Sequence, residues 1–431
     1  MAFEDSHRSA PMQSSRPLAL VFVSAIGGCV APGSEKTPSS DSGFGTSVGG
    51  STGASTTEAQ DDGLDTDGDE STGIDTMPRP DVGLGGDLGD GTSTSTTGTS
   101  DSGIDADTAD TTGSQAREWS LEALEEARIY SESIDTAAFM LVVDGHVLAS
   151  WGDVSFEYYS HSIRKSLLSA LIGMLVAEGK LTLSSTLQQL GIDDSVHPLT
   201  AEEKQATVGD LLESKSGVYL PANAETDVQR QLRPDRGSYP PGTYWYYNNW
   251  DFNALGTIYQ QASGSDIYLD FDEKIAKPLN MLDYSAFDQT YQPGPDSSHP
   301  SYPFVISTRD LASFGQLFLQ DGMWDGQQML SPQWVADSTM SYAEAFSFET
   351  GLPAGGYGYM WWIAVDGVHF PGVDVPEGTY SARGIQGHFV VVIPSLDAVI
   401  VHRVNTTTAF DHVTDDEFGH LLSLVLGAAP A

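Results

Sequence analysis

Residues 162–180 of the chain are SIRKSLLSALIGMLVAEGK, a largely apolar stretch with few polar interruptions. This pattern predicts a long helix that runs through the core of a globular body. The stretch opens with the spacing Ser-x-x-Lys, which is formed by Ser162 and Lys165. Because positions i and i+3 lie on one face of a helix, the Lys165 ammonium can reach the Ser162 hydroxyl.

The environment expected for this pair favours nucleophilic chemistry. A serine at the start of a helix lies near free backbone N–H groups and the positive end of the helix dipole, which stabilise negative charge on an adduct. Lys165 on an apolar helix loses solvation, and this loss lowers the pKa of the amine toward that of a usable base. The spacing alone decides little, since a helix-capping serine and a surface lysine produce the same pattern.

Two further segments carry residue types that suit a reaction at a carbonyl group. Residues 241–250, PGTYWYYNNW, place Tyr247 and Asn249 two positions apart, so that both project to one side of an extended segment. A phenol can relay a proton, and an amide can orient a lysine and hold a substrate carbonyl. Aromatic core packing accounts for part of this stretch.

Residues 382–387, ARGIQG, precede an apolar strand predicted at 388–393. Glycines at this position let a ligand approach the strand edge, whose N–H groups can form half of an oxyanion hole. A tight turn into the strand explains the glycines equally well.

Strand and helix patterns on both sides of the central helix outline the fold. A hairpin is predicted over 137–151 around the turn Asp144-Gly145. Further strands are predicted at 359–365, 388–393 and 398–403, and helices at 118–133, 207–212, 253–262, 266–276, 309–320 and 417–426. Strands near both chain ends with helices between them predict an α/β body of the α+β type, whose sheet is assembled from the two ends.

Composition excludes several classes of function. The 431 residues include 60 acidic and 19 basic side chains, a net charge of −41, so we expect no nucleic-acid partner. One cysteine allows neither an internal disulfide nor a cysteine-rich metal site. The histidines are scattered, and neither a metal motif nor a nucleotide-binding loop is present, so we expect no metal and no cofactor.

The N-terminal part differs from the rest of the chain. Residues 17–28, PLALVFVSAIGG, follow two arginines and end at Cys29, and Ile26 to Cys29 resemble a bacterial lipobox. We therefore predict a lipoprotein signal peptide over 1–29 with Cys29 as the lipidation site, and export across the inner membrane of a bacterium to a lipid-anchored place in the cell envelope. An ordinary secretory signal is the alternative, and Met12 is an alternative start.

Residues 30–116 consist mainly of Ser, Thr, Gly and Asp, a composition that predicts a disordered acidic linker. The globular domain is then predicted over 117–431. We expect contact with the membrane only through the N-terminal lipid anchor.

Taken in this order, the three motifs resemble those of the serine β-lactamase-related hydrolases. This family includes class C β-lactamases and the related, penicillin-binding-protein-like D-alanyl-D-alanine peptidases, and the chain looks nearest to the carboxylesterase and 6-aminohexanoate-dimer hydrolase subgroup. The resemblance covers about 137–427 and includes TVGDLLESKSG at 207–217, PLNM at 278–281, STRDL at 307–311, DGMWDG at 321–326 and YGYMWW at 357–362. It implies a β-lactamase/transpeptidase-like fold: an antiparallel sheet flanked by helices, plus a mostly helical lobe, with the active site between them.

The resemblance also implies roles for individual residues. Ser162 is the nucleophile that accepts the acyl group, Lys165 is its base, and Tyr247 passes the proton to the leaving group. Asn249 positions Lys165 and the substrate. The backbone N–H groups of Ser162 and Ile385 form the oxyanion hole.

One departure from the family pattern bears on the substrate. Many relatives carry Lys-Thr-Gly or His-x-Gly where this chain has Ala382, Arg383 and Gly384. The missing cation or hydroxyl argues against efficient binding of a β-lactam carboxylate, and Arg383 either binds a substrate carboxylate or points away. The expected function is a serine hydrolase that cleaves carboxylic esters or small linear amides. The alternatives are a D,D-peptidase or β-lactamase, and a non-catalytic surface binding module.

Overall fold

The computed structural model describes residues 118–430. The predicted signal peptide over 1–29, the lipidation site Cys29 and the acidic segment 30–116 lie outside the described residues, so these assignments stay predictions. No helix within 118–430 combines the length and the apolar character needed to cross a membrane.

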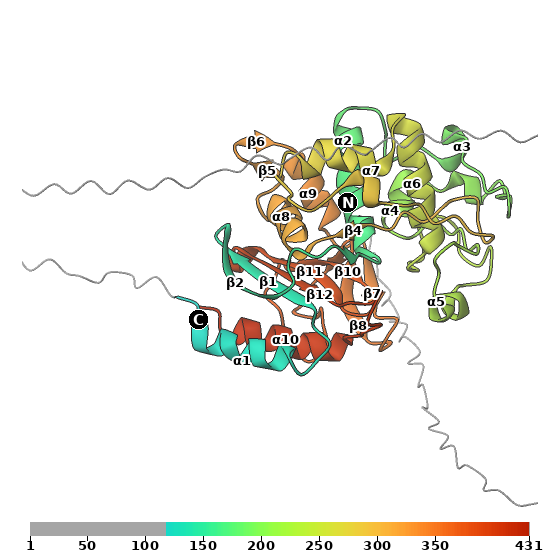
Figure 1. The fold of residues 1–431 in the computed structure, drawn as a ribbon. Helices are drawn as coiled ribbons and strands as arrows, with labels where there is room; N and C mark the ends of the chain where they lie inside the picture. The colour runs from blue at the N-terminus through green and yellow to red at the C-terminus, as the bar shows by residue number, and fades with distance from the viewer. Residues whose placement is uncertain (1–117, 431) are drawn as a thin grey trace, which may run out of the picture. The chain divides into compact units, whose positions relative to one another are not determined.

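An antiparallel sheet of eight strands lies at the centre of the described body (Figure 1). Its strand order is β2-β1-β12-β11-β10-β9-β8-β7, so the first two strands pair with the last ones in the sequence. The strands are β1 (Ala138–Val143), β2 (His146–Gly152), β7 (Ala343–Phe346), β8 (Pro353–Tyr357), β9 (Trp362–Ile363), β10 (Tyr380–Gly384), β11 (His388–Ile393) and β12 (Ala398–Arg403). The predicted assembly of the sheet from both chain ends is confirmed.

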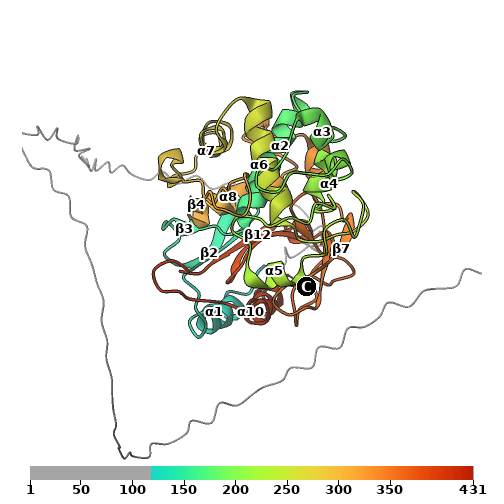
Figure 2. The ribbon, with the colours of Figure 1, turned by 90° about the vertical axis from the view of Figure 1, so that its right-hand side faces the viewer.

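Helices cover both faces of this sheet, and this explains why the inner strand β1 is apolar along its whole length. On one face lie α1 (Leu121–Ser131) and α10 (Asp415–Gly427), which run side by side in Figures 1 and 2. Alternate residues of β1 contact different layers: Phe139 and Leu141 pack toward α1 and α10, whereas Met140 and Val142 join the core on the other face. A strand buried on both sides has no polar alternation.

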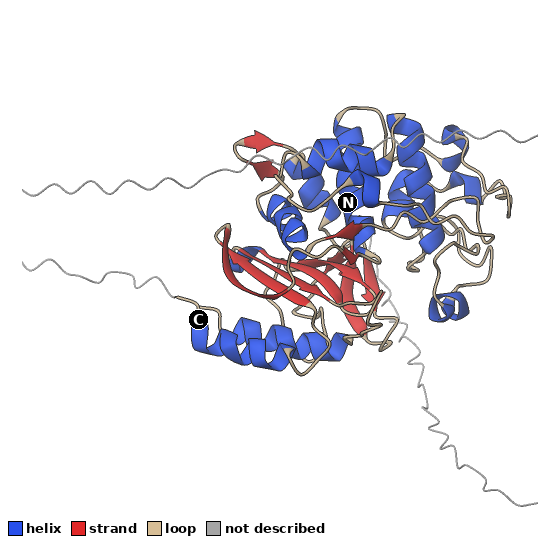
Figure 3. Cartoon of the chain, viewed as in Figure 1, coloured by secondary structure: helices blue, strands red, loops and turns tan. Residues whose placement is uncertain are grey.

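The second face carries a larger group of helices (Figure 3). The central helix α2 (Ile163–Ala177) is buried along most of its length, as its composition predicts. The other elements are α3 (Leu187–Leu190), α4 (Val208–Leu212), α5 (Asp227–Leu232), α6 (Asn249–Ser263), α7 (Ile267–Phe271), α8 (Thr308–Leu319), α9 (Pro332–Ser338) and the short strand pairs β3 (Tyr158–Tyr159) with β4 (Val305–Ile306) and β5 (Met323–Trp324) with β6 (Gln327–Gln328).

Several predicted boundaries are wrong. The helix predicted over 253–262 begins at Asn249, because Asn248 accepts a hydrogen bond from the backbone N–H of Trp250 and caps the helix. Asn249 therefore lies on a helix and not on an extended segment with Tyr247. The strand predicted over 359–365 is reduced to β9, and the helix predicted over 266–276 is α7 followed by one wider turn over Asp272–Ala276.

Candidate active site

Ser162 and Lys165 lie together at the start of α2, as the sequence predicts. Ser162 is the residue that begins the helix, and its hydroxyl caps no backbone N–H group. Instead, the Lys165 amine donates a hydrogen bond of 2.5 Å to the Ser162 hydroxyl oxygen. The serine oxygen is thus left available at a helix N-terminus with a nitrogen base in direct contact.

Lys165 is buried in a way that suits a base. Its side chain is 2% exposed, and its nitrogen lies 4.8 Å from the ring centre of Tyr247 and 4.9 Å from that of Phe252. Burial, reinforced by the charge of Arg164, holds the pKa of Lys165 well below its usual range. A lysine in this environment is able to accept the proton of the serine hydroxyl.

Tyr247 precedes α6 and faces the same pair. Its ring is held against Trp362, with ring centres 5.6 Å apart and planes inclined by 28°. Burial raises the pKa of the phenol, and the neighbouring Ser162 acts in the opposite direction. Tyr247 therefore keeps its proton at neutral pH and is able to donate it.

Asn249 is buried on the first turn of α6 and lines a small cavity with Ser162 and Lys165. Its side-chain amide donates a hydrogen bond of 2.9 Å to Gln229 on α5. The Lys165 amine has one side-chain hydrogen bond within residues 118–430, to Ser162, so the structure links Asn249 to α5 and not to the lysine.

Gln229 and Thr226 are site residues that the sequence reasoning missed. The Gln229 side chain also accepts hydrogen bonds from the backbone N–H and the hydroxyl of Thr226, which closes a capping box at the start of α5. Both residues line the cavities beside Ser162. The spacing Thr-x-x-Gln at 226–229 is the signal that predicts this cap.

The end of β10 forms the wall opposite Tyr247. Gly384 packs so closely against the segment before α2 that an added Cβ would lie 2.6 Å from the carbonyl oxygen of Ser160. His161 has a left-handed backbone with φ of 47°, which turns the chain from β3 into α2. Ile385, which follows Gly384, is 48% exposed and lines both cavities.

Arg383 lines the main cavity, but its guanidinium is held by other groups. Its nitrogens donate hydrogen bonds to the Ser381 hydroxyl and the His369 carbonyl, both at 2.9 Å. The guanidinium carbon lies 3.9 Å from the ring centre of Phe370. Burial lowers the pKa of Arg383 to about 10. The side chain is therefore engaged with the protein rather than free to meet a ligand.

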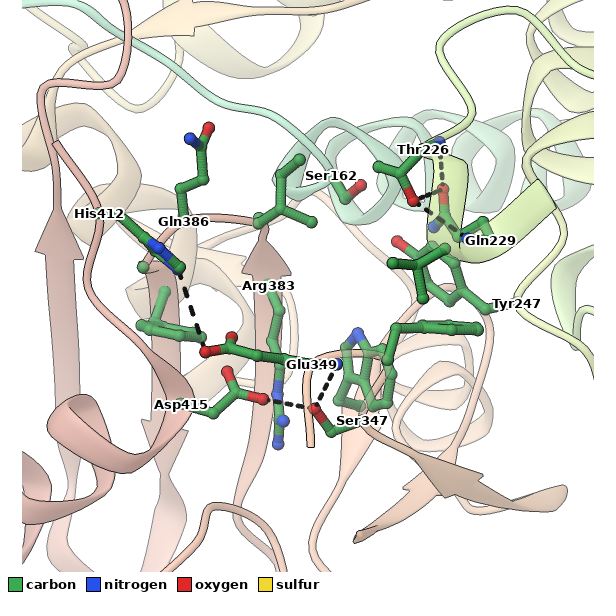
Figure 4. Close-up of a pocket in the computed structure, with 17 residues that line it drawn as sticks. Ser162, Thr226, Gln229, Tyr247, Ser347, Glu349, Arg383, Gln386, His412 and Asp415 are labelled. Carbon is green, nitrogen blue, oxygen red and sulfur yellow. Dashed lines mark hydrogen bonds and ion pairs between the residues drawn. The ribbon is translucent and has the colours of Figure 1, made fainter. Parts of the chain in front are cut away.

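The main cavity has a volume of about 280 Å³ and opens beside Ser162 (Figure 4). Much of its wall is apolar, with contributions from Val228, Phe348, Trp362 and Phe389. A smaller cavity of about 60 Å³ also borders Ser162 and is lined in part by Lys165 and Asn249. The serine is thus next to a largely apolar cavity and a small polar one.

Acidic side chains form the far side of the main cavity. Figure 4 shows Glu349, Asp415 and His412 grouped on the side away from Tyr247. The His412 ring lies 4.0 Å from a Glu349 oxygen, and Asp415 accepts a hydrogen bond of 2.7 Å from Ser347. Burial and the neighbouring charge of Asp415 raise the pKa of Glu349.

A buried arginine fixes the segment that leads to the serine. Arg403 at the end of β12 is fully buried and donates hydrogen bonds to the carbonyl oxygens of Tyr158, Tyr159 and Ile306. A further bond of 3.0 Å joins it to the His388 ring. Among residues 118–430, no group of three His, Cys, Asp or Glu side chains is placed to hold a metal ion.

Comparison with known proteins identifies a family for the described body. The family model described as Beta-lactamase matches residues 121–423. An unguisins hydrolase from Aspergillus campestris is 22% identical over 315 residues, a match that covers 63% of this chain and 57% of the relative. The chain thus spans little more than half the length of that curated relative.

Solved structures show the same fold at low sequence identity. A β-lactamase from Mycobacterium bovis is 21% identical, with a TM-score of 0.50 over 72% of this chain and 100% of that chain. A protein described as a 6-aminohexanoate-dimer hydrolase from Bacillus anthracis is 19% identical, with a TM-score of 0.51 over 70% and 83% of the two chains. EstCE1, a hydrolase with promiscuous acyltransferase activity, is 14% identical, with a TM-score of 0.52 over 72% and 98%.

The family model spans almost all of the described body, and the serine, lysine and tyrosine expected from the sequence meet inside it. The predicted resemblance and fold class are confirmed: this chain belongs to the Beta-lactamase family.

Proposed function

We propose that the protein is a serine hydrolase that cleaves carboxylic esters or small linear amides through an acyl-enzyme on Ser162. The observation that carries the proposal is the contact between Ser162 and Lys165. A buried lysine with a lowered pKa lies 2.5 Å from a serine hydroxyl that makes no capping bond. This is the arrangement of an activated nucleophile.

The first half of the reaction forms the acyl-enzyme. Lys165 accepts the hydroxyl proton while the Ser162 oxygen bonds to the substrate carbonyl carbon. The backbone N–H groups of Ser162 and Ile385 stabilise the negative charge that develops on the carbonyl oxygen. The tetrahedral adduct then expels the alcohol or amine, which takes a proton from Tyr247, and Tyr247 recovers a proton from Lys165.

The second half releases the acyl group. Water attacks the carbonyl carbon of the acyl-enzyme, and its proton passes to the base, Lys165. The bond to the Ser162 oxygen then breaks, Ser162 recovers this proton, and the free acid leaves. No cofactor enters this sequence. Asn249 and Gln229 hold α5 against the start of α6 and so shape the side of the site where the leaving group departs.

The cavity supports esters and linear amides as substrates. Its apolar wall, built by Val228, Phe348, Trp362 and Phe389, suits an acyl chain. Ala382 stands at the position where many relatives carry a cation, and the guanidinium of Arg383 is bonded to Ser381 and His369. Neither residue offers the charge that would bind a β-lactam carboxylate.

Intact mass spectrometry of the full chain tests the proposal. The protein is exposed briefly to p-nitrophenyl butyrate and, separately, to a penicillin, with Ser162→Ala alongside. Ser169→Ala is the matched control, because Ser169 is buried on the same helix and has no hydrogen-bond partner among the described residues. We expect a butyryl adduct or steady p-nitrophenol release that is lost in Ser162→Ala and kept in Ser169→Ala.

Two results would overturn this proposal in different ways. A lasting penicilloyl adduct without ester turnover would place the protein with the D,D-peptidases. Neither an adduct nor turnover with either compound would favour a surface binding module.

A further inference from the structure

Arg164 is a buried cation beside Lys165 on α2, and the reaction above gives it no role. The residue is 4% exposed. One of its nitrogens donates a hydrogen bond of 2.8 Å to Asn253, and its guanidinium carbon lies 4.2 Å from the ring centre of Tyr302. Both partners are uncharged, so neither neutralises the guanidinium.

Within residues 118–430, Arg164 forms no ion pair with a carboxylate. Its second terminal nitrogen is buried and has no hydrogen-bond partner among residues 118–430. Asp251, a buried acid on the same helix as Asn253, accepts its hydrogen bonds from Ser216 and Asn248. Burial also raises the pKa of Asp251 well above its usual range, which disfavours a charged carboxylate there.

This charge acts on the catalytic pair. Arg164, Ser162 and Lys165 line the same small cavity. A fixed positive charge disfavours a second one nearby, and screening is weak in a buried site. In agreement, burial is the main reason for the low pKa of Lys165, and the charge of Arg164 is the next. The same charge opposes the rise that burial causes in the pKa of Tyr247.

The other groups that face Lys165 are neutral at physiological pH. Tyr247 keeps its proton, and Phe252 and Asn249 have no titrating group. His161, which precedes the serine, has its pKa lowered to about 4, chiefly by burial. Among these described neighbours of Lys165, Arg164 is the one that carries a permanent charge.

We propose that Arg164 is an electrostatic positioning residue, whose buried and unpaired charge holds Lys165 in the neutral form that takes the proton from Ser162. The inference rests on the proposed function, since it assumes that Lys165 is the base. Among the described residues, Arg164 has its side-chain hydrogen bond with Asn253 and none with Ser162 or Lys165, so its influence on the lysine is through its charge.

The pH dependence of Ser162 labelling by a fluorophosphonate tests this inference. In that reaction the serine oxygen bonds to phosphorus, the P–F bond breaks, fluoride leaves and the serine proton passes to Lys165. Intact mass spectrometry of the full chain follows the reaction between pH 5 and 10, and it detects labelling that is far slower than turnover. The rate falls on the acid side as Lys165 becomes protonated, and the midpoint of that fall is the quantity measured.

Three variants separate charge from structure. Arg164→Gln keeps a donor for Asn253 but removes the charge, and we expect the midpoint to rise by about one pH unit. Arg164→Lys keeps the charge, and Asn253→Ala removes the hydrogen bond of Arg164 while the charge remains. Both should leave the midpoint in place. The inference is wrong if Arg164→Gln has the wild-type midpoint, or if the two charge-retaining variants shift as far as Arg164→Gln.

Lys165→Ala distinguishes failure of the inference from failure of the proposed function. If the labelling rate of Lys165→Ala still falls on the acid side, Lys165 is not the base, and this step of the proposed function is wrong. If the fall disappears in Lys165→Ala and is unmoved in Arg164→Gln, only the role of Arg164 is refuted. Circular dichroism of each variant verifies that the rates come from folded protein.

Discussion

Replacing Gly384 with alanine tests whether the close packing of β10 against the serine segment sets the geometry of the reaction. The added Cβ would lie 2.6 Å from the Ser160 carbonyl oxygen and 3.0 Å from the His161 Cβ. Ordinary van der Waals contact begins at 3.4 Å, so the two segments must separate by about 0.8 Å. The contacted oxygen belongs to the backbone and cannot turn aside as a flexible side chain does.

This separation has a predictable effect on catalysis. An oxyanion donor works at about 2.7–3.1 Å from the charged oxygen, and a displacement of about 0.8 Å takes the Ile385 N–H beyond hydrogen-bond range. Loss of one such donor lowers kcat by roughly 100-fold to 1000-fold. Overpacking at this site also lowers the free energy of unfolding by about 1–3 kcal/mol.

A matched glycine separates these two effects. Gly315 lies on α8 against β12, and an added Cβ there would meet a methyl group of Val399 at 2.5 Å. Neither α8 nor β12 lines the cavities beside Ser162. Steady-state hydrolysis of p-nitrophenyl butyrate and urea unfolding are measured for both variants. We expect Gly315→Ala to lose stability and keep kcat, and Gly384→Ala to lose both. A wild-type kcat in folded Gly384→Ala would refute the oxyanion assignment.

Three further outcomes follow from the charges of the structure. In Lys165→Met, stability at pH 7 rises by about 1 kcal/mol, because burial lowers the pKa of the native lysine well below that of the unfolded one. The stability of the wild type should therefore grow with pH up to about 10. Urea unfolding of both proteins at pH 7 and pH 9 checks this, and a loss of stability at pH 7 in the variant contradicts it. Glu349→Gln should lower the kcat/KM of an ammonium-bearing ester, relative to the kcat/KM of its neutral isostere, about 5-fold, as expected for an ion pair worth about 1 kcal/mol. Glu344→Gln, which changes an exposed residue on β7, should leave this relative kcat/KM unchanged. Arg403→Met removes the hydrogen bonds that buried carbonyl oxygens accept and lowers the free energy of unfolding by about 3 kcal/mol. A change of less than about 1 kcal/mol in urea unfolding would show that these bonds do not stabilise the fold.

Much of the fold follows from local patterns in the sequence. Two apolar runs around Asp144-Gly145 predict the hairpin of β1 and β2, and a long, largely apolar stretch predicts α2. By contrast, β7 and β8 are short, and β8 is PAGGY, which shows neither alternation nor an apolar run. Such strands form because a neighbour offers hydrogen bonds, and that neighbour is set by the tertiary fold.

Some contacts of the candidate site can likewise be predicted from the sequence, and others cannot. The contact of Ser162 with Lys165 follows from helical spacing, and the approach of Tyr247 follows from the family resemblance. The sequence does not decide the orientation of Arg383, because it depends on which face of β10 each residue occupies. Ala382 joins the core that contains α2, and Arg383 stacks on Phe370 in the core that contains α10, as the two-residue period of a strand requires. The link from Asn249 to Gln229 joins separate segments and has no local signal.

The tie between Arg403 and the segment before the serine has a consequence for the order of folding. Arg403 bonds to the carbonyl of Tyr158, 245 positions earlier in the chain, and β1 pairs with β12 over a similar span. Contacts between such distant positions form late and slowly, because the closure of a long loop must precede them. The serine segment therefore acquires its native shape only after the last strand has been synthesised. We expect a nascent chain still held on the ribosome before residue 403 to be inert, so that hydrolysis begins with the finished protein.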